Sequence, residues 1–328
     1  MNYVPLGRTG VQVSQLCFGT MSFGAEADEK MSAKMFHRCR EAGINFFDCA
    51  DVYSKGKAET ILGGLIADCR DKIVLTSKVY GVMGDDINAR GLSRRHIMQA
   101  VEASLQRLGT DHLDLYFAHR FDSLTELEHT LRAFDDLIRD GKILYPAASN
   151  WAAWQISTAL GVSRAEGLAR FECIQPMYNL VKRQAETEIL PLAEAERLAV
   201  ISYSPLGGGM LTGKYGKFGS GKKADSGRFA ERDMYVKRYS LPSYHETAQR
   251  FATHAAEHGV APASLAVAWV MTNPAITAPI IGARNLEQLE SSLAAVDIAL
   301  TPEWRDEISA LSPAPVPATD RLEETINS

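Results

Sequence analysis

Short apolar runs alternate along this chain with longer amphipathic segments. The runs have the length and composition of buried parallel strands, and the intervening segments have the spacing of surface helices. The alternation repeats about eight times, which favours an α/β fold. Strands are expected near Leu16–Phe18, Phe46–Asp48, Ile73–Lys78, Leu113–Ala118, Tyr145–Ser149, Phe171–Gln175, Ala199–Ser202 and Pro279–Ile281.

The ends of several helices are marked by capping residues. Asp28 and Ser93 each precede an amphipathic segment, and their side-chain oxygens suit the unpaired amide protons of a first helical turn. The segment beginning at Ser93 runs to about Leu108. A further helix is predicted over Leu124–Asp140 and should end at Gly141, since glycine accepts the left-handed conformation that often follows a helix.

The same elements could form either an open doubly wound sheet or a closed barrel. A doubly wound dinucleotide-binding sheet normally carries a GxGxxG turn after its first strand. Neither Gly19–Gly24 nor Gly207–Gly209 fits that turn. We therefore predict a (β/α)8 TIM barrel, with residues 1–328 forming one domain and a helix at the C-terminus.

Two segments fall outside the repeat. Tyr3–Val13, with Gly7 and Gly10 at its bend, is expected to form a hairpin that covers the bottom of the barrel. Gly216–Ser240 is long, rich in glycine and lysine, and weakly patterned. Long loops in compact domains are usually functional or mobile, so a loop of that kind is expected there.

Composition narrows the functional classes. Hydrophobic residues make up 46% and charged residues 23%, as in a globular protein, and 35 basic against 40 acidic residues give a net charge of −5. This mild acidity gives no reason to expect binding to nucleic acid or to an anionic membrane. The five cysteines form no CxxC pair, and we expect neither disulfides nor a metal site. Without a signal-peptide pattern or an apolar run of about 20 residues, a cytoplasmic location is expected.

Polar residues follow the predicted strands one after another. Asp48, Lys78 and His119 end or follow three successive strands. In a barrel such positions converge on the C-terminal face, where active sites are built. The later strands contribute further polar residues: Ser149, Asn150, Gln175, Tyr203 and Ser204.

Together with Tyr53, three of these residues suit proton donation to a carbonyl. A nearby ammonium such as that of Lys78 favours the phenolate of Tyr53, Asp48 would fix the lysine, and His119 could orient a substrate oxygen. The hydride would have to come from a cofactor, since no side chain supplies one. Taken singly, each residue is more often a cap, a surface group or core packing. Their succession along the strands favours the functional interpretation.

Long segments of the chain resemble those of aldo-keto reductases, closest to the bacterial and potassium-channel β-subunit-like branch. The match runs in order over almost the whole chain, and GINFFDCADVYSKGKAETILG is similar to the family's first signature. The resembling segments are Leu6–Gly24, Gly43–Gly63, Leu113–Asp122, Ile174–Glu186, Ile201–Tyr215 and Ala278–Leu293.

The resemblance implies an eight-stranded barrel and an enzyme that reduces aldehydes or ketones with NAD(P)H. Tyr53 would be the general acid, Lys78 its activator, Asp48 the partner of Lys78, and His119 the group that steers the carbonyl. Arg284 suits a 2′-phosphate by its planar fork, so NADPH is expected, with NADH possible. Positions implied to bind the cofactor are Gly19, Thr20, Met21, Asp48, Ser149, Asn150, Gln175, Tyr203, Ser204, Pro205, Leu206, Gly208, Lys214, Arg228, Gly282, Arg284 and Gln288.

The chain departs from the family pattern at two places. Ser291–Ser292 stands where family members often carry Glu-Asn, which would grip the adenosine, so the preference for NADPH over NADH is left open. Pro146–Ala148 replaces a more usual Gly-Val or Gly-Thr and would shift the fifth barrel strand slightly.

Other functions compete with the reductase. Potassium-channel β subunits share the fold and cofactor site and act chiefly as partners, but carry asparagine at the position of His119. A nucleoside-triphosphatase is disfavoured, because Gly208–Lys214 and Gly216–Lys222 lack the Ser or Thr that follows a P-loop lysine. A small-molecule carbonyl substrate is expected, and the oligomeric state is open. The pocket would be lined by residues that follow strand ends, namely Met21, Phe23, Tyr80, Arg120, Phe121 and Trp151.

Overall fold

The described part of the chain forms a closed barrel of eight parallel strands. The computed structural model describes residues 1–214, 229 and 233–321. The strand order β10-β3-β4-β5-β6-β7-β8-β9 makes neighbours in sequence neighbours in space, and the barrel closes where β10 pairs with β3. The predicted barrel is therefore confirmed and the open doubly wound sheet is excluded. The barrel strands are β3 (Cys17–Gly19), β4 (Phe46–Asp48), β5 (Val74–Val79), β6 (Leu113–Ala118), β7 (Ile143–Ser149), β8 (Cys173–Gln175), β9 (Ala199–Ser202) and β10 (Ala278–Ile281).

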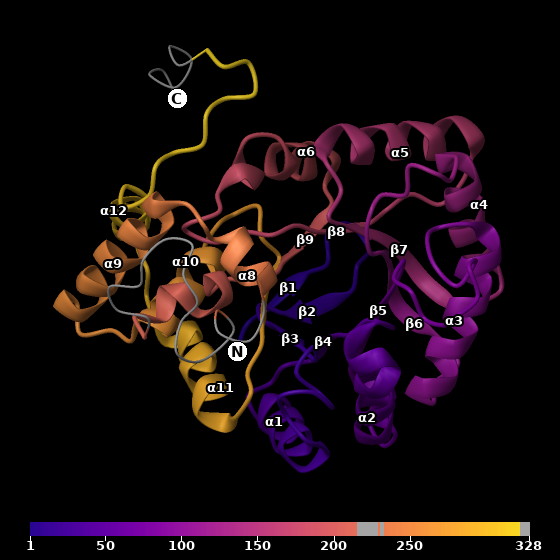
Figure 1. The fold of residues 1–328 in the computed structure, drawn as a ribbon, viewed down its shortest axis with the longest axis horizontal. Coiled ribbons are helices and arrows are strands. Elements are labelled where there is room, and N and C mark those ends of the chain that lie inside the picture. The colour runs from indigo at the N-terminus through magenta and orange to yellow at the C-terminus, as the bar shows by residue number, and fades with distance from the viewer. Residues whose placement is uncertain (215–228, 230–232, 322–328) are drawn as a thin grey trace.

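Helices surround the strands (Figure 1). None of those in the described residues combines the length and apolar character needed to cross a membrane. The helices are α1 (Glu29–Glu41), α2 (Lys57–Ile66), α3 (Arg94–Leu108), α4 (Leu127–Arg139), α5 (Ala153–Glu166), α6 (Ile189–Glu196), α8 (Asp233–Arg238), α9 (Pro242–Glu257), α10 (Pro262–Met271), α11 (Leu286–Leu293) and α12 (Pro302–Ser309). Short 3-10 turns are η1 (Tyr53–Gly56), η2 (Arg70–Lys72), η3 (Gln184–Glu186), η4 (Gly207–Thr212) and η5 (Ala294–Asp297).

Predicted and observed element boundaries agree closely, with two corrections. Each barrel strand begins and ends within two residues of its expected position, and Asp28 and Ser93 cap α1 and α3 as expected. The helix predicted from Leu124 begins only at Leu127, because the Asp122 carboxylate accepts the Leu124 amide and shapes a turn there. The loop predicted over Gly216–Ser240 contains α8 within its described part.

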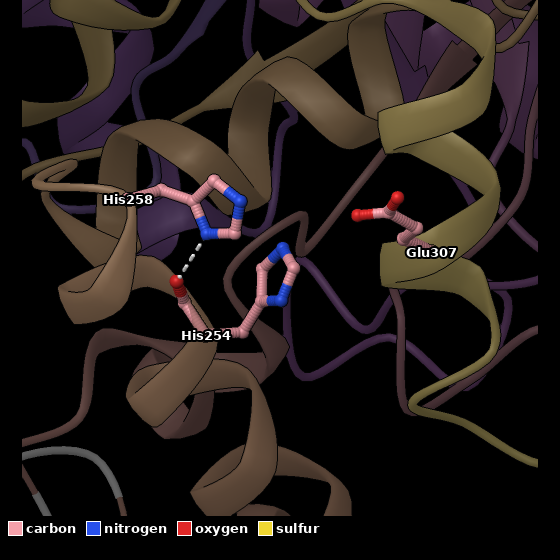
Figure 2. A group of neighbouring side chains, drawn as sticks. All are labelled: His254, His258 and Glu307. Atoms are coloured by element: carbon pink, nitrogen blue, oxygen red, sulfur yellow. Dashed lines mark hydrogen bonds between the residues drawn. The ribbon is translucent and has the colours of Figure 1, made fainter.

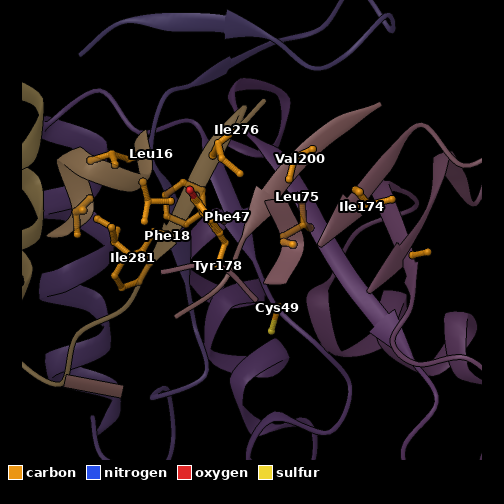
Figure 3. Close-up of a cluster of buried hydrophobic side chains, with 14 of the residues drawn as sticks. Leu16, Phe18, Phe47, Cys49, Leu75, Ile174, Tyr178, Val200, Ile276 and Ile281 are labelled. Carbon is orange, nitrogen blue, oxygen red and sulfur yellow. The ribbon is translucent and has the colours of Figure 1, made fainter. Parts of the chain in front are cut away.

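Alternating side chains give the barrel an inner and an outer core. Successive residues of a strand point to opposite faces. Cys17, Phe46 and Cys173 belong to the cluster inside the barrel, whereas their neighbours along the chain pack outward beneath the helices (Figure 3). The alternation of inward and outward apolar residues along each strand thus sets how neighbouring strands are aligned in the barrel.

The N-terminal hairpin covers one end of the barrel, as predicted. β1 (Tyr3–Pro5) and β2 (Gln12–Ser14) pair antiparallel, and Leu6 and Val13 pack against the inner cluster, which includes the first residue of β9. Gly7 lies at φ 55°, and a β-carbon there would stand 2.8 Å from the Ala199 amide nitrogen. Only glycine fits this contact, which closes the bottom of the barrel.

A glycine pair on α2 offers a test of helix packing. A β-carbon on Gly63 would lie 2.6 Å from the Leu108 carbonyl oxygen, whereas one on Gly64 meets nothing within 4 Å. We expect Gly63→Ala to lower the free energy of unfolding by about 1–3 kcal/mol through overpacking. Gly64→Ala should instead raise it by up to ~1 kcal/mol through helix propensity. Urea denaturation of both variants checks this, and equal effects would contradict it.

Candidate active site

The C-terminal ends of the strands open into a cavity of about 480 Å³. This volume is within the usual range for a small-molecule site. Residues at the ends of the barrel strands, in the loops that follow them and in α8 form its wall. The lining residues are Gly19, Met21, Ser22, Asp48, Val52, Tyr53, Tyr80, Gly81, His119, Arg120, Asn150, Gln175, Tyr203, Ser204, Pro205, Leu206, Gly208, Met234, Tyr235, Arg238, Ile280, Ile281, Gly282, Ala283 and Ser292.

Strand alternation explains why the polar residues face the cavity. Asp48 lies two residues after Phe46, and Gln175 lies two residues after Cys173, so both share the inward face. Lys78 lies on the inward face of β5 by the same parity, four residues after Val74. An apolar layer therefore fills the lower barrel, and a polar layer sits on top of it.

Lys78 and Asp48 form a buried ion pair at the floor of the cavity. The Lys78 ammonium lies 2.7 Å from each carboxylate oxygen of Asp48 and donates also to the Cys49 carbonyl at 2.7 Å. Asp48 Oδ1 further accepts from Thr76 at 3.0 Å and from Gln175 at 2.8 Å. The buried charges are thus paired and hydrogen-bonded, which is the condition for tolerating them in an interior.

The Lys78 ammonium also reaches Tyr53, so its three N–H groups are shared among four acceptors. The ammonium lies 3.3 Å from the phenolic oxygen. Tyr53 opens η1, where Ser54 and Lys55 adopt left-handed φ values of 49° and 53°, and Ser54 anchors the turn by donating to the Phe23 carbonyl at 2.8 Å. The strained turn thereby presents the Tyr53 ring to the cavity.

The pKa of Tyr53 moves against the simplest expectation. Burial raises it above the ordinary value, and the Lys78 charge lowers it only in part. The lowering effect of the lysine on the Tyr53 pKa is present, as expected from the sequence, but burial is the larger cause and the net shift is upward. Tyr53 is therefore a neutral phenol that holds its proton at physiological pH, as a general acid must.

His119 faces Tyr53 across the cavity as a neutral imidazole. The two rings meet edge to face with centroids 6.3 Å apart. Burial, with the nearby charges of Lys78 and Arg120, lowers the His119 pKa to about 3. At neutral pH the ring can therefore donate or accept a hydrogen bond, but it cannot serve as a cationic acid.

Amide and hydroxyl groups continue the polar wall. Asn150 donates to the His119 carbonyl at 3.0 Å and accepts from the Tyr203 hydroxyl at 2.6 Å. Asn150 and Ser204 both adopt φ 60°, a conformation that exposes the residue just past its strand. Ser149 is buried behind them, donating to the Gln175 carbonyl at 3.0 Å.

The structure places the predicted cofactor residues in three groups. Most line the cavity, including Gly19, Met21, Gly208 and Gly282. Arg228 lies outside the described residues. Within the described chain, the predicted residues outside the lining are Thr20, whose hydroxyl donates to the Asp48 carbonyl, Ser149, Lys214, which is exposed after η4, and Arg284 with Gln288 at the start of α11.

The two departures from the family pattern have different outcomes. Ser292 lines the cavity and donates to the Gln288 carbonyl at 3.4 Å. A short hydroxyl group therefore faces the cavity at a position where aldo-keto reductases were expected to carry a longer side chain. β7 runs unbroken through Pro146 and pairs with β6 and β8 on its two sides. The substitution of Pro146–Ala148 therefore leaves the strand continuous.

The predicted aromatic pocket is only partly correct. Met21, Tyr80 and Arg120 line the cavity. Phe121, Trp151 and Phe23 do not; Trp151 packs 5.0 Å from Phe121 in an edge-on contact, and Phe23 packs in the core. Phe23 and Trp151 are buried in the outer apolar core, and Phe121 packs half-buried against it.

Several lining residues were missed by the sequence analysis. Met234, Tyr235 and Arg238 reach the cavity from α8, in the segment predicted as a loop. Arg238 lies four residues after Met234 and three after Tyr235, a spacing that puts the three side chains on one side of a helix. This spacing was the signal in the sequence that could have predicted the helix. The other lining residues that were missed carry no comparable signal; they are Ser22, Val52, Gly81, Ile280, Ile281 and Ala283.

Asp51, next to the active-site turn, gives a pH-dependent prediction. It is fully buried, and neither carboxylate oxygen has a hydrogen-bond partner among the described residues. Burial, with the nearby charge of Glu59, raises its pKa from 3.8 to about 7. Between these values the folded state holds a proton that the unfolded state has lost, so stability falls as pH rises, by up to about 1.4 kcal/mol per pH unit, and levels off above pH 7.

Asp51→Asn should remove this part of the pH dependence. The variant is expected to gain stability over wild type at pH 8 and to match it near pH 4, because asparagine imitates the protonated acid. Thermal unfolding at both pH values measures the difference. A constant offset at the two pH values would assign Asp51 a packing role only.

Comparison with known proteins identifies the relatives of this chain. The model of the Aldo/keto reductase family matches residues 15–313. An uncharacterized oxidoreductase, YrpG, of Bacillus subtilis is 37% identical over 96% of this chain and 97% of its own. A probable voltage-gated potassium channel subunit beta of Oryza sativa is also 37% identical, over 95% and 96%. A versiconal hemiacetal acetate reductase of Aspergillus parasiticus is 31% identical, over 92% and 94%.

Proposed function

This chain belongs to the aldo/keto reductase family, and from that premise we propose that it reduces aldehydes and ketones with NADPH, using Tyr53 as general acid. It is an oxidoreductase, as its family and its oxidoreductase-named relatives indicate. The observation that carries the finer proposal is the buried Lys78 ammonium, which lies 2.7 Å from Asp48 and 3.3 Å from the Tyr53 hydroxyl, and both of these residues line the cavity.

The donor set of the cavity fits a nicotinamide cofactor. Asn150 and Gln175 offer amide groups that complement a carboxamide, and Tyr203 supplies an aromatic wall beside them. Gly282 also lines the cavity, and because a β-carbon there would meet nothing closer than 3.8 Å, its bare main chain leaves room for phosphates. Gly208 lines the cavity too, with the Tyr235 ring packed against it. When bound, the reduced nicotinamide would supply a hydride to the carbonyl carbon.

The protein's own residues would supply the proton and hold the substrate. Because Lys78 donates to the Tyr53 oxygen, the phenolic hydrogen is directed away from the lysine and into the cavity. His119, a neutral imidazole, would hydrogen-bond the carbonyl oxygen and orient it toward Tyr53. Asp48 is saturated by Lys78, Thr76 and Gln175, so it would hold the lysine without taking the proton.

The test is consumption of NADPH, and separately of NADH, by the purified protein with a panel of aldehydes and ketones. Turnover with NADPH that exceeds turnover with NADH supports the proposal. Cofactor binding without reduction of any carbonyl would reject it. We propose further that residues 1–328 act as one domain in the cytoplasm on small-molecule carbonyls.

A regulatory role is the second candidate, favoured by the relatives named as potassium channel β subunits. Such a protein would bind the cofactor tightly and turn over slowly. The presence of His119, at a position where channel β subunits are expected to carry asparagine, argues for the reductase. The kinetic panel separates the two, because a regulatory protein would show saturable cofactor binding with negligible turnover.

Arg284 is proposed to select the 2′-phosphate of NADPH. Its guanidinium lies 3.5 Å from Glu26, beside the lining residue Ala283, and a phosphate would compete for it. Arg284→Gln is expected to raise KM for NADPH about tenfold, the cost of one charge-assisted hydrogen bond, and to leave KM for NADH nearly unchanged. Initial rates with both cofactors measure the effect. Equal increases for the two cofactors would reject phosphate selection.

A further inference from the structure

Outside the cavity, α9 and α12 bring two histidines and a glutamate together (Figure 2). His254 lies in the last turn of α9 and His258 is the C-cap residue four positions later, while Glu307 approaches from α12. One ring nitrogen of each histidine and one carboxylate oxygen of Glu307 all lie within 4.8 Å of one another. None of the three lines the active-site cavity. No metal site was expected from the sequence, although His254 and His258 are four residues apart.

His258 is oriented as a metal ligand usually is. Its Nδ1 lies 2.8 Å from the His254 carbonyl oxygen and donates to it as the protonated nitrogen (Figure 2). The opposite nitrogen, Nε2, then carries a lone pair. In metal sites the second ring nitrogen typically donates to a carbonyl in this way, which fixes the tautomer and the ring orientation.

His254 points its Nε2 toward the same space (Figure 2). The Trp304 indole N–H donates to His254 Nε2 at 2.8 Å and so competes for that lone pair.

We propose that His254, His258 and Glu307 bind a zinc ion that links α9 to α12 and takes the His254 lone pair from the Trp304 indole. Two imidazoles and one carboxylate form a recognised zinc donor set, with water as a fourth ligand. Magnesium and calcium prefer sets made of oxygen. Ligand atoms around tetrahedral zinc lie about 3.3 Å apart. The contraction from 4.8 Å is within reach of the exposed side chains of His258 and Glu307.

The first experiment is calorimetric titration of zinc chloride into the full chain, without an affinity tag and after treatment with a chelator. One zinc per chain is expected. His258→Ala and Glu307→Gln should each weaken binding by more than roughly tenfold, since each removes a ligand. His129→Ala is the matched control, because His129 is exposed on α4 and belongs to no cluster among the described residues. It should bind zinc as wild type does.

The second experiment uses the competing indole. Trp304→Phe keeps an aromatic ring against His258 but removes the N–H donor, so zinc affinity should rise roughly fivefold, the worth of one hydrogen bond. In wild type, zinc should also change the tryptophan emission spectrum, and this change should be absent in Trp304→Phe.

Three results would overturn the proposal. The first is that zinc titration into wild type gives no binding signal. The second is that wild type and both ligand variants bind zinc equally. The third is that the zinc affinity of Trp304→Phe is unchanged or weaker than that of wild type. The readouts are binding and fluorescence, so they do not depend on the proposed reductase activity.

Discussion

Tyr53→Phe is expected to lower kcat for carbonyl reduction by about 10²–10⁴-fold, the usual contribution of a positioned acid. The substitution removes only the hydroxyl that Lys78 holds at 3.3 Å, and keeps the ring that lines the cavity. Cofactor affinity should change little. The measurement is turnover at saturating cofactor and substrate, with cofactor binding determined separately.

Tyr80→Phe provides a matched comparison for that experiment. Tyr80 also lines the cavity, but Lys78 donates to Tyr53 and not to Tyr80 among the described contacts. Its loss of turnover should be far smaller. If Tyr53→Phe kept more than about a tenth of wild-type turnover, proton donation would have to be assigned to another group, such as water ordered by His119.

Lys78→Met should destabilise the fold as well as abolish turnover. The lysine is fully buried, and its removal leaves the Asp48 carboxylate buried without its counter-charge. Breaking such a pair costs about 3–5 kcal/mol. Urea denaturation at pH 7 measures the loss in the free energy of unfolding, and the two hydrogen bonds from Thr76 and Gln175 place a limit on it.

The double variant Asp48→Asn with Lys78→Met tests the cause. If the cost arises from the stranded charge, neutralising Asp48 should recover most of the stability without recovering turnover. A double variant that is less stable than Lys78→Met would show instead that packing of the lysine stem carries the loss. Either result also shows whether stability and activity can be separated at this site.

The barrel could be predicted because all of its strands share one pattern of apolar residues. Each carries apolar residues on both faces, and this run of buried residues ends where a polar residue enters the cavity, as at Asp48 and Gln175. Capping residues such as Ser93 then fixed the helix positions. These signals are local, so a single sequence contains them.

Other features could not be predicted because they depend on contacts between distant segments. The helix that contributes Arg238 to the cavity spans only Asp233–Arg238 and lies in a long, weakly patterned segment. Trp151 turned out to pack against Phe121 and Phe171, a choice that depends on neighbouring helices. The direction of the Tyr53 pKa shift depends on burial, which a sequence does not give.

The hydrogen bond from Gln175 to Asp48 has a consequence for biogenesis. β8 and β4 lie on opposite sides of the ring, so this contact joins the two halves of the chain. During synthesis β4 and β5 leave the ribosome long before β8, and domains tend to fold as whole units. A nascent chain therefore has Lys78 and Tyr53 but not the completed polar layer. Enzymatic competence would arise late, so that recovery of activity on refolding reports the arrival of β8 opposite β4.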